Sequence, residues 1–76
     1  MLAAALEHLV KGIVDHPDDV RIEAVTSSRG EVLEVRVHPD DRGRVIGRGG
    51  RNAKALRTLV AALAGGRRVR VDVADD

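Results

Sequence analysis

The spacing of apolar residues along the first half of the chain changes from a helical pattern to a strand pattern. Five aliphatic residues at helical spacing predict a helix over residues 2–14, ending before Pro17; they are Leu2, Leu6, Leu9, Val10 and Ile13. Apolar and polar residues then alternate over residues 20–24 and 33–37, with turn-forming residues at 27–30 between them. These two segments predict a β-hairpin with one buried face.

The second half of the chain predicts two more helices and a closing strand. Pro39, followed by Asp40 and Asp41, is typical of a helix start, because proline suits the first helical position and carboxylates favour the positive end of the helix dipole. This short second helix is expected to run into a glycine-rich loop. Helical spacing returns after Gly50 and continues until Gly65 and Gly66; its apolar positions are Ala53, Leu56, Leu59, Val60 and Leu63. With an alternating strand over residues 69–73, the sequence predicts an α+β domain.

Length and composition narrow the function classes. A chain of 76 residues forms one domain, residues 1–76, and buries only about 60% of its unfolded surface, which leaves little room for an enclosed active site. Aromatic residues make up 0% of the chain, so bases cannot stack on aromatic rings. No cysteine is present, which excludes disulfides and thiolate metal sites. Because Glu7, His8 and Lys11 interrupt the first apolar segment, we expect neither a signal peptide nor a membrane span, and a cytoplasmic protein.

Charges are strongly segregated along the chain. Residues 1–41 hold 4 basic and 9 acidic groups, whereas residues 42–71 hold 9 basic groups and no acidic group. This asymmetry indicates a polyanionic partner that meets one face of the domain. The alternative is a solvated basic face that the acidic half of the chain balances. Both interpretations stay open for Arg67, Arg68 and Arg70, which precede or begin the last strand.

The segment "GRVIGRGGRNAKALR", residues 43–57, is the strongest functional signal in the sequence. Glycines allow a sugar-phosphate backbone to approach the chain closely, and the free N–H groups at the start of the next helix favour anions. A nucleotide-binding P-loop would need Lys-Ser or Lys-Thr after the glycines, and a dinucleotide fingerprint would need glycine in place of Asn52. The segment therefore indicates contact with phosphates without either of these nucleotide sites.

"VIGRGG", residues 45–50, resembles the signature of KH domains, a G-x-x-G loop at residues 47–50 that joins two helices and binds single-stranded nucleic acid. The order of the predicted elements is similar to that of type II KH domains, and the chain as a whole resembles the small stand-alone bacterial KH proteins of the KhpA family. The resemblance is strongest over residues 30–73. It implies the fold order α-β-β-α-α-β, with a three-stranded sheet packed on one side by three helices.

The resemblance also implies a site and partners. Gly47, Arg48, Gly49 and Gly50 would hold the RNA backbone, Ile46 and Ala53 would line an apolar groove, and Val35 or Val37 would form its far wall. Together with the cations that flank the loop, the predicted RNA-binding residues are Arg44, Ile46, Gly47, Arg48, Gly49, Gly50, Arg51 and Lys54. The family further implies single-stranded RNA as ligand, a homodimer or a heterodimer with a larger Jag-type KH protein, and a role as a post-transcriptional regulator or RNA chaperone linked to growth and division.

The residues themselves give no reason to expect an enzyme, a cofactor or a metal site. No serine or cysteine lies beside a histidine in a recognisable catalytic pattern, and the three histidines are scattered, with His16 and Asp19 the only suggestion of a ligand pair. Two hypotheses remain. The first is a sequence-tolerant binder of single-stranded RNA. The second is a protein-assembly module with weak or vestigial RNA contact.

Overall fold

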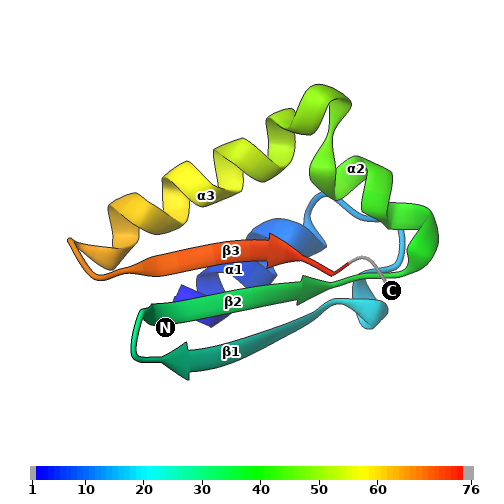
Figure 1. Ribbon diagram of the computed structural model, residues 1–76. Helices are drawn as coiled ribbons and strands as arrows, with labels where there is room; N and C mark the ends of the chain where they lie inside the picture. The colour runs from blue at the N-terminus through cyan, green and yellow to red at the C-terminus, as the bar shows by residue number, and fades with distance from the viewer. Residues whose placement is uncertain (1, 75–76) are drawn as a thin grey trace.

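A computed structural model of the chain describes residues 2–74. It contains the helices α1 (Leu2–Lys11), α2 (Arg42–Ile46) and α3 (Arg51–Ala64), and the strands β1 (Arg21–Ser27), β2 (Gly30–Arg36) and β3 (Val69–Val73). Single 3₁₀ turns occupy Pro17–Asp19, Pro39–Asp41 and Arg48–Gly50. The order confirms the predicted α-β-β-α-α-β arrangement (Figure 1).

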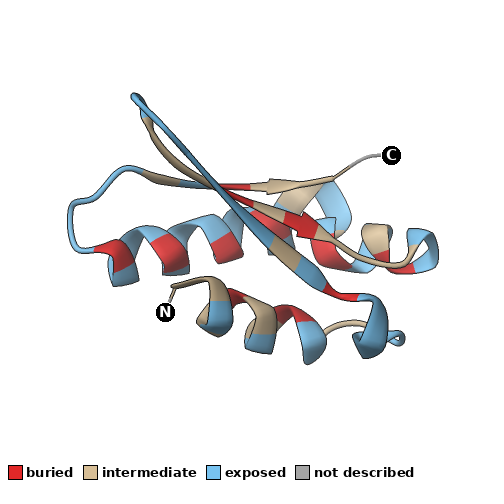
Figure 2. Ribbon diagram, turned by 90° about the horizontal axis from the view of Figure 1, so that it is seen from below, coloured by how far each residue is buried: buried red, intermediate tan, exposed pale blue. Residues whose placement is uncertain are grey.

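The three strands form one mixed sheet with β2 in the middle. β1 pairs antiparallel with β2, and β3 pairs parallel with β2 on the other side. The register places Leu33 between Ala24 and Val71, and Val35 between Ile22 and Val73, which gives the sheet one apolar face. All three helices lie on the same side of the sheet, as Figures 1 and 2 show together.

The core fills the space between this apolar face and the helices. Its fully or nearly fully buried side chains come from every helix and from the two strands β2 and β3; they include Leu6, Val10, Leu33, Val35, Val45, Leu56, Val60 and Val71. Figure 2 shows these buried positions as a stripe along α3 and α1 that faces the sheet. Val45 matters most for the site, because this fully buried side chain anchors the five-residue helix α2 beside the loop that follows it.

The element boundaries differ from the predictions at three places. Helix α1 ends at Lys11 and not near residue 14, because Gly12 favours helical geometry poorly. The chain still coils onward, since the N–H of Val14 donates to the carbonyl of Val10 at 3.3 Å. Strands β1 and β2 extend to Ser27 and Gly30, beyond the alternating segments, because backbone pairing continues to the turn.

Helix α3 also faces the core with a different set of residues than its apolar spacing suggested. Its buried positions are Ala53, Leu56, Val60 and Ala64, at spacings of three, four and four. Leu59 and Leu63 lie outside this stripe and are 46% and 58% exposed. Both leucines therefore do not belong to the core and lie on the exposed surface of α3.

Candidate nucleic-acid interface

A four-residue glycine loop, Gly47–Gly50, joins the end of α2 to the start of α3, at the corner of the molecule where the two helices meet (Figure 1). The N–H of Gly47 donates to the carbonyl of Gly43 at 2.8 Å and completes α2. The N–H of Gly50 donates to the carbonyl of Gly47 at 3.0 Å and closes the 3₁₀ turn. Short backbone bonds on both sides therefore fix the shape of the loop.

Gly47 is the position at which only glycine fits. Its φ of 78° with ψ of 168° is a backbone conformation that residues other than glycine rarely adopt. A Cβ atom there would lie 2.8 Å from the backbone nitrogen of Asn52 and 2.9 Å from its Cγ. The Asn52 side chain is itself fixed, because its Nδ2 donates to the carbonyl oxygen of Arg44 at 2.7 Å. Asn52 thus ties the first turn of α3 to the last turn of α2.

Gly49 and Gly50 have a different role from Gly47. Both have positive φ, 64° and 79°, but a Cβ atom at either position would meet nothing within 4 Å. Their backbone atoms are therefore open to solvent on the outer side of the loop. A ligand can approach this stretch of main chain from the side on which a Cβ atom would lie.

The cations predicted for the site lie around this bare backbone. Arg48, Arg51 and Lys54 are exposed on the loop and the first turn of α3, and none of them forms an ion pair with any residue that the structure describes. Arg44 differs, because its Nη1 lies 3.0 Å from the Asp15 Oδ1, with both side chains more than half exposed. An exposed pair of this kind contributes only about 0.2–1 kcal/mol, so Arg44 can exchange Asp15 for a phosphate at little cost.

Only part of the implied apolar groove is accessible. Ile46 is 39% exposed directly before the loop, so its side chain can contact a base. Ala53 and Val35 are buried at 6% and 0% exposure and belong to the core, whereas Val37 is half-buried. Val35 therefore cannot form the far wall, because the sheet register turns its side chain toward the helices.

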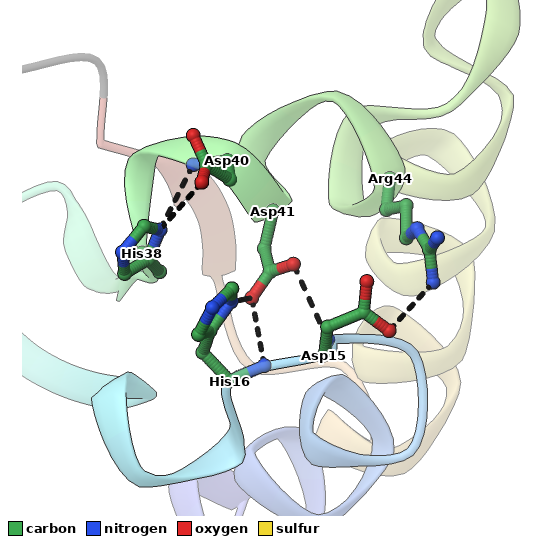
Figure 3. Close-up of polar contacts among 6 residues, drawn as sticks. All are labelled: Asp15, His16, His38, Asp40, Asp41 and Arg44. Atoms are coloured by element: carbon green, nitrogen blue, oxygen red, sulfur yellow. Dashed lines mark hydrogen bonds and ion pairs between the residues drawn. The ribbon is translucent and has the colours of Figure 1, made fainter.

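A buried carboxylate lies at the start of α2, and its contacts were not predicted from the sequence (Figure 3). Asp41 was expected to favour the dipole of the second helix, but its side chain is only 1% exposed. Its oxygens accept hydrogen bonds from the backbone N–H groups of Asp15 at 3.2 Å and His16 at 3.0 Å, and the Nδ1 of the His16 ring also lies 3.0 Å away. Asp41 therefore joins the segment after α1 to the start of α2.

These contacts shift two ionisation equilibria in opposite directions. Burial by itself would raise the pKa of the Asp41 carboxyl, but the hydrogen bonds from the His16 ring and from the two backbone N–H groups outweigh it and lower this pKa. The hydrogen bond to Asp41 raises the pKa of the His16 imidazole. Asp41 is thus held as an anion, and proton binding at His16 strengthens the contact.

The expectation of scattered histidines was wrong. The rings of His16 and His38 stack with their centroids 4.0 Å apart, and each histidine begins one of the two "HPDD" segments, which form the 3₁₀ turns Pro17–Asp19 and Pro39–Asp41. His16 contacts Asp41 and not its suggested partner Asp19. Among residues 2–74, no group of three or more potential ligands could hold a metal ion. No helix in the same range is long and apolar enough to cross a membrane.

Comparison with known proteins assigns the family. A model of the KhpA/KhpB KH domain matches residues 3–74. The chain belongs to this family. A relative in Leifsonia xyli, named RNA-binding protein KhpA, is 79% identical over 76 residues and covers 100% of both chains. The protein of the same name in Streptomyces coelicolor is 68% identical over 75 residues, 99% of this KH protein and 94% of that relative. Another, in Halalkalibacterium halodurans, is 50% identical over 72 residues, covering 92% and 95% of the two chains.

Proposed function

We propose that this KH domain binds single-stranded RNA through its glycine loop and the first turn of α3. The observation that carries the proposal is the open main chain at Gly49 and Gly50, surrounded by exposed cations that have no acidic partner in the described structure. The names of the relatives, RNA-binding protein KhpA, support RNA as the polyanion. No part of this function requires catalysis.

The loop suits phosphates for two physical reasons. The N–H of Arg51 donates to the carbonyl of Arg48, but the backbone N–H groups that follow it at a helix start have no helical acceptor. The first turn of α3 also carries no acidic residue, so the positive end of the helix dipole faces the loop. Arg48 at the tip and Arg51 and Lys54 on α3 add charge in the same region. With about three to four phosphates held, the slope of log K against log [salt] should be about −2 to −3 for a single strand.

The bases contribute little sequence preference in this proposal. The chain contains no aromatic residue, so stacking on rings, which is the usual means of holding unpaired bases, is absent. Ile46 offers an aliphatic contact beside the loop. Binding should therefore be tolerant of sequence and weak for one domain. It would gain from a second copy that holds the same strand.

The surface of α3 supports dimerisation as a second part of the proposal. Leu59 is exposed beside a hollow between α1 and α3 that Leu9 and Ile13 also line, and Leu63 continues the apolar surface along α3. We place a homodimer contact, or the contact with a larger KH protein of the same family, on this face. Leu59→Glu with Leu63→Glu should give a monomer by light scattering and change stability by no more than about 0.5 kcal/mol, because both side chains are exposed. An unchanged dimer would contradict this assignment.

We take the cellular role from what membership of the KhpA/KhpB family implies. We place the protein in the cytoplasm as a post-transcriptional regulator or RNA chaperone that acts in growth and division. The competing hypothesis is an assembly module that uses the α3 face and contacts RNA weakly. The exposed leucines Leu59 and Leu63 favour that hypothesis, because an apolar surface of this kind serves protein pairing and not RNA binding.

Fluorescence anisotropy with labelled single-stranded RNA, matched DNA and double-stranded RNA tests the RNA proposal. The test variant is Arg48→Asp with Gly49→Asp, since both positions are exposed and aspartate tolerates the positive φ of Gly49 better than most residues. Its control is Ala4→Asp with Arg21→Asp, two exposed positions on α1 and β1 that give the same change in net charge. We expect the test variant to lose salt-sensitive binding to single-stranded RNA while the control retains it. Equal binding by parent and test variant would overturn the proposal.

A further inference from the structure

A second cationic region lies at the opposite end of α3 from the glycine loop. There the β1–β2 turn and the α3–β3 connection meet, as Figure 1 shows at the ends of these elements. Between them is a hollow of about 450 Å³. We call it the arginine pocket after the side chains that line it, which include Arg29, Arg67, Arg68 and Arg70.

The two loops that form the arginine pocket are held together tightly. The N–H of Glu31 donates to the carbonyl of Arg68 at 2.9 Å. A Cβ atom on Gly30 would lie 2.6 Å from the same carbonyl, so the backbones approach as closely as they do only because residue 30 is glycine. On the other side, the Ser27 hydroxyl accepts from the N–H of Arg29 at 3.2 Å and donates to the carbonyl of Gly30 at 3.2 Å. The backbone positions of arginines from distant parts of the chain are thus fixed relative to one another.

The charge of the arginine pocket is largely uncompensated. Arg29, Arg67 and Arg68 are exposed and form no ion pair with any residue between 2 and 74. Arg70 pairs with Asp72, Nε to Oδ1 at 3.2 Å, and Glu31 is the one acidic residue among those that line the hollow. Like charges gathered in a concave site without acidic partners are costly unless an anion shares the site, and guanidinium groups suit phosphate oxygens.

The route between the two cationic regions also carries positive charge. Arg51, Lys54 and Arg57 follow one another at intervals of three along α3, toward the arginine pocket. The Nε of Arg57 donates to the carbonyl of Val71 at 3.1 Å, which holds this guanidinium over β3. At about 1.5 Å per residue, the 14 residues of α3 span about 21 Å. Even when stacked at about 3.4 Å per nucleotide, an RNA of about twelve nucleotides covers about 40 Å and can reach both ends.

We propose that the arginine pocket is a second phosphate-binding site, which holds the backbone of the same RNA strand that the glycine loop binds. The inference rests on the proposed function, since it takes RNA as the ligand. It extends that function by giving the domain a longer binding path than the loop alone. It also predicts that affinity depends on RNA length beyond the roughly four nucleotides that one KH loop accommodates.

The test compares the full-length parent with Arg67→Gln/Arg68→Gln, by anisotropy on a labelled single-stranded RNA of about twelve nucleotides over a range of salt. Two lost phosphate contacts, at about 0.7 each for a single strand, should reduce the salt slope by about 1.4 and weaken binding about 25-fold at 0.1 M salt. The control, Lys11→Gln/Arg21→Gln on α1 and β1, removes the same charge and should change the slope by much less. Arg67→Lys/Arg68→Lys should restore most of the slope, because it restores the charge.

Two results would overturn the proposal: an unchanged slope in Arg67→Gln/Arg68→Gln, or an equal loss in the control pair. Circular dichroism of each variant shows whether the fold is retained. If a poly-glutamate peptide, and not RNA, shifts the NMR signals of Arg29 and Arg68, the pocket serves an acidic protein segment and the proposal is wrong. Failure of the proposed function is distinguishable, because it appears as unchanged binding in Arg48→Asp/Gly49→Asp, whatever the arginine-pocket variant does.

Discussion

Gly47 and Gly49 provide a direct test of how the glycine loop is built, because they share a positive φ but differ in their surroundings. At Gly49 an added methyl group would meet nothing within 4 Å, so Gly49→Ala costs only the left-handed backbone, about 1 kcal/mol. At Gly47 the backbone conformation costs about 1–3 kcal/mol. The methyl group would also lie 2.8 Å from the Asn52 nitrogen, and such overpacking adds about 1–3 kcal/mol.

Gly47→Ala should therefore destabilise the domain by about 4 kcal/mol, several times more than Gly49→Ala. A domain of 76 residues has a total stability of about 4–11 kcal/mol, so the first change removes a large part of it. Urea unfolding followed by far-ultraviolet circular dichroism measures both costs, since the chain has no tryptophan or tyrosine to report by fluorescence. Equal costs at the two positions, or a larger cost at Gly49, would refute the packing of Asn52 against Gly47.

Further predictions concern the contacts that hold α2 in place. Asn52→Ala should cost about 1 kcal/mol in urea unfolding, because it removes the hydrogen bond to the Arg44 carbonyl. The raised pKa of His16 means that its stabilising contribution is fully present below pH about 6.5, the ordinary value, and is lost as pH rises through the folded pKa. The lowered pKa of Asp41 gives a contribution that is present above pH about 3.9 and is lost as pH falls through its folded pKa. Urea midpoints of the parent and of His16→Gln, measured from pH 3 to 9, check both signs; a constant difference between the two proteins across the neutral range would contradict the His16 contact.

The sequence predicted the fold well because the local periods agree with the final packing. Alternation over residues 69–73 matched β3 without change, and the glycines at 65 and 66 did end α3. The side of α3 that faces the core was not predictable, because Leu59 and Val60 both fit helical spacing and only packing against the sheet decides between them.

The sequence placed the glycines of the loop next to the cations, but it did not predict the contacts that hold the loop in place. The glycines and their neighbouring cations are adjacent in sequence, so their proximity followed directly from the motif. The contact between Asp41 and His16 joins residues 25 apart, and no local pattern specifies it. The distinct roles of Gly47 and Gly49 depend on the position of Asn52 in three dimensions, and were equally hidden. Contacts between residues far apart in the sequence, therefore, could not be predicted from it.

The central claim, that the glycine loop is the RNA contact, is tested most directly by an amide NMR titration with single-stranded RNA at low salt. We predict that the largest shifts fall on residues 47–52 and extend along α3, while the signals of residues 21–24, at the start of β1, stay unchanged. The exposed backbone of Gly49, where an added Cβ atom would meet nothing within 4 Å, should respond first. Largest shifts on β1 or α1, with residues 47–52 unaffected at saturating RNA, would contradict the account.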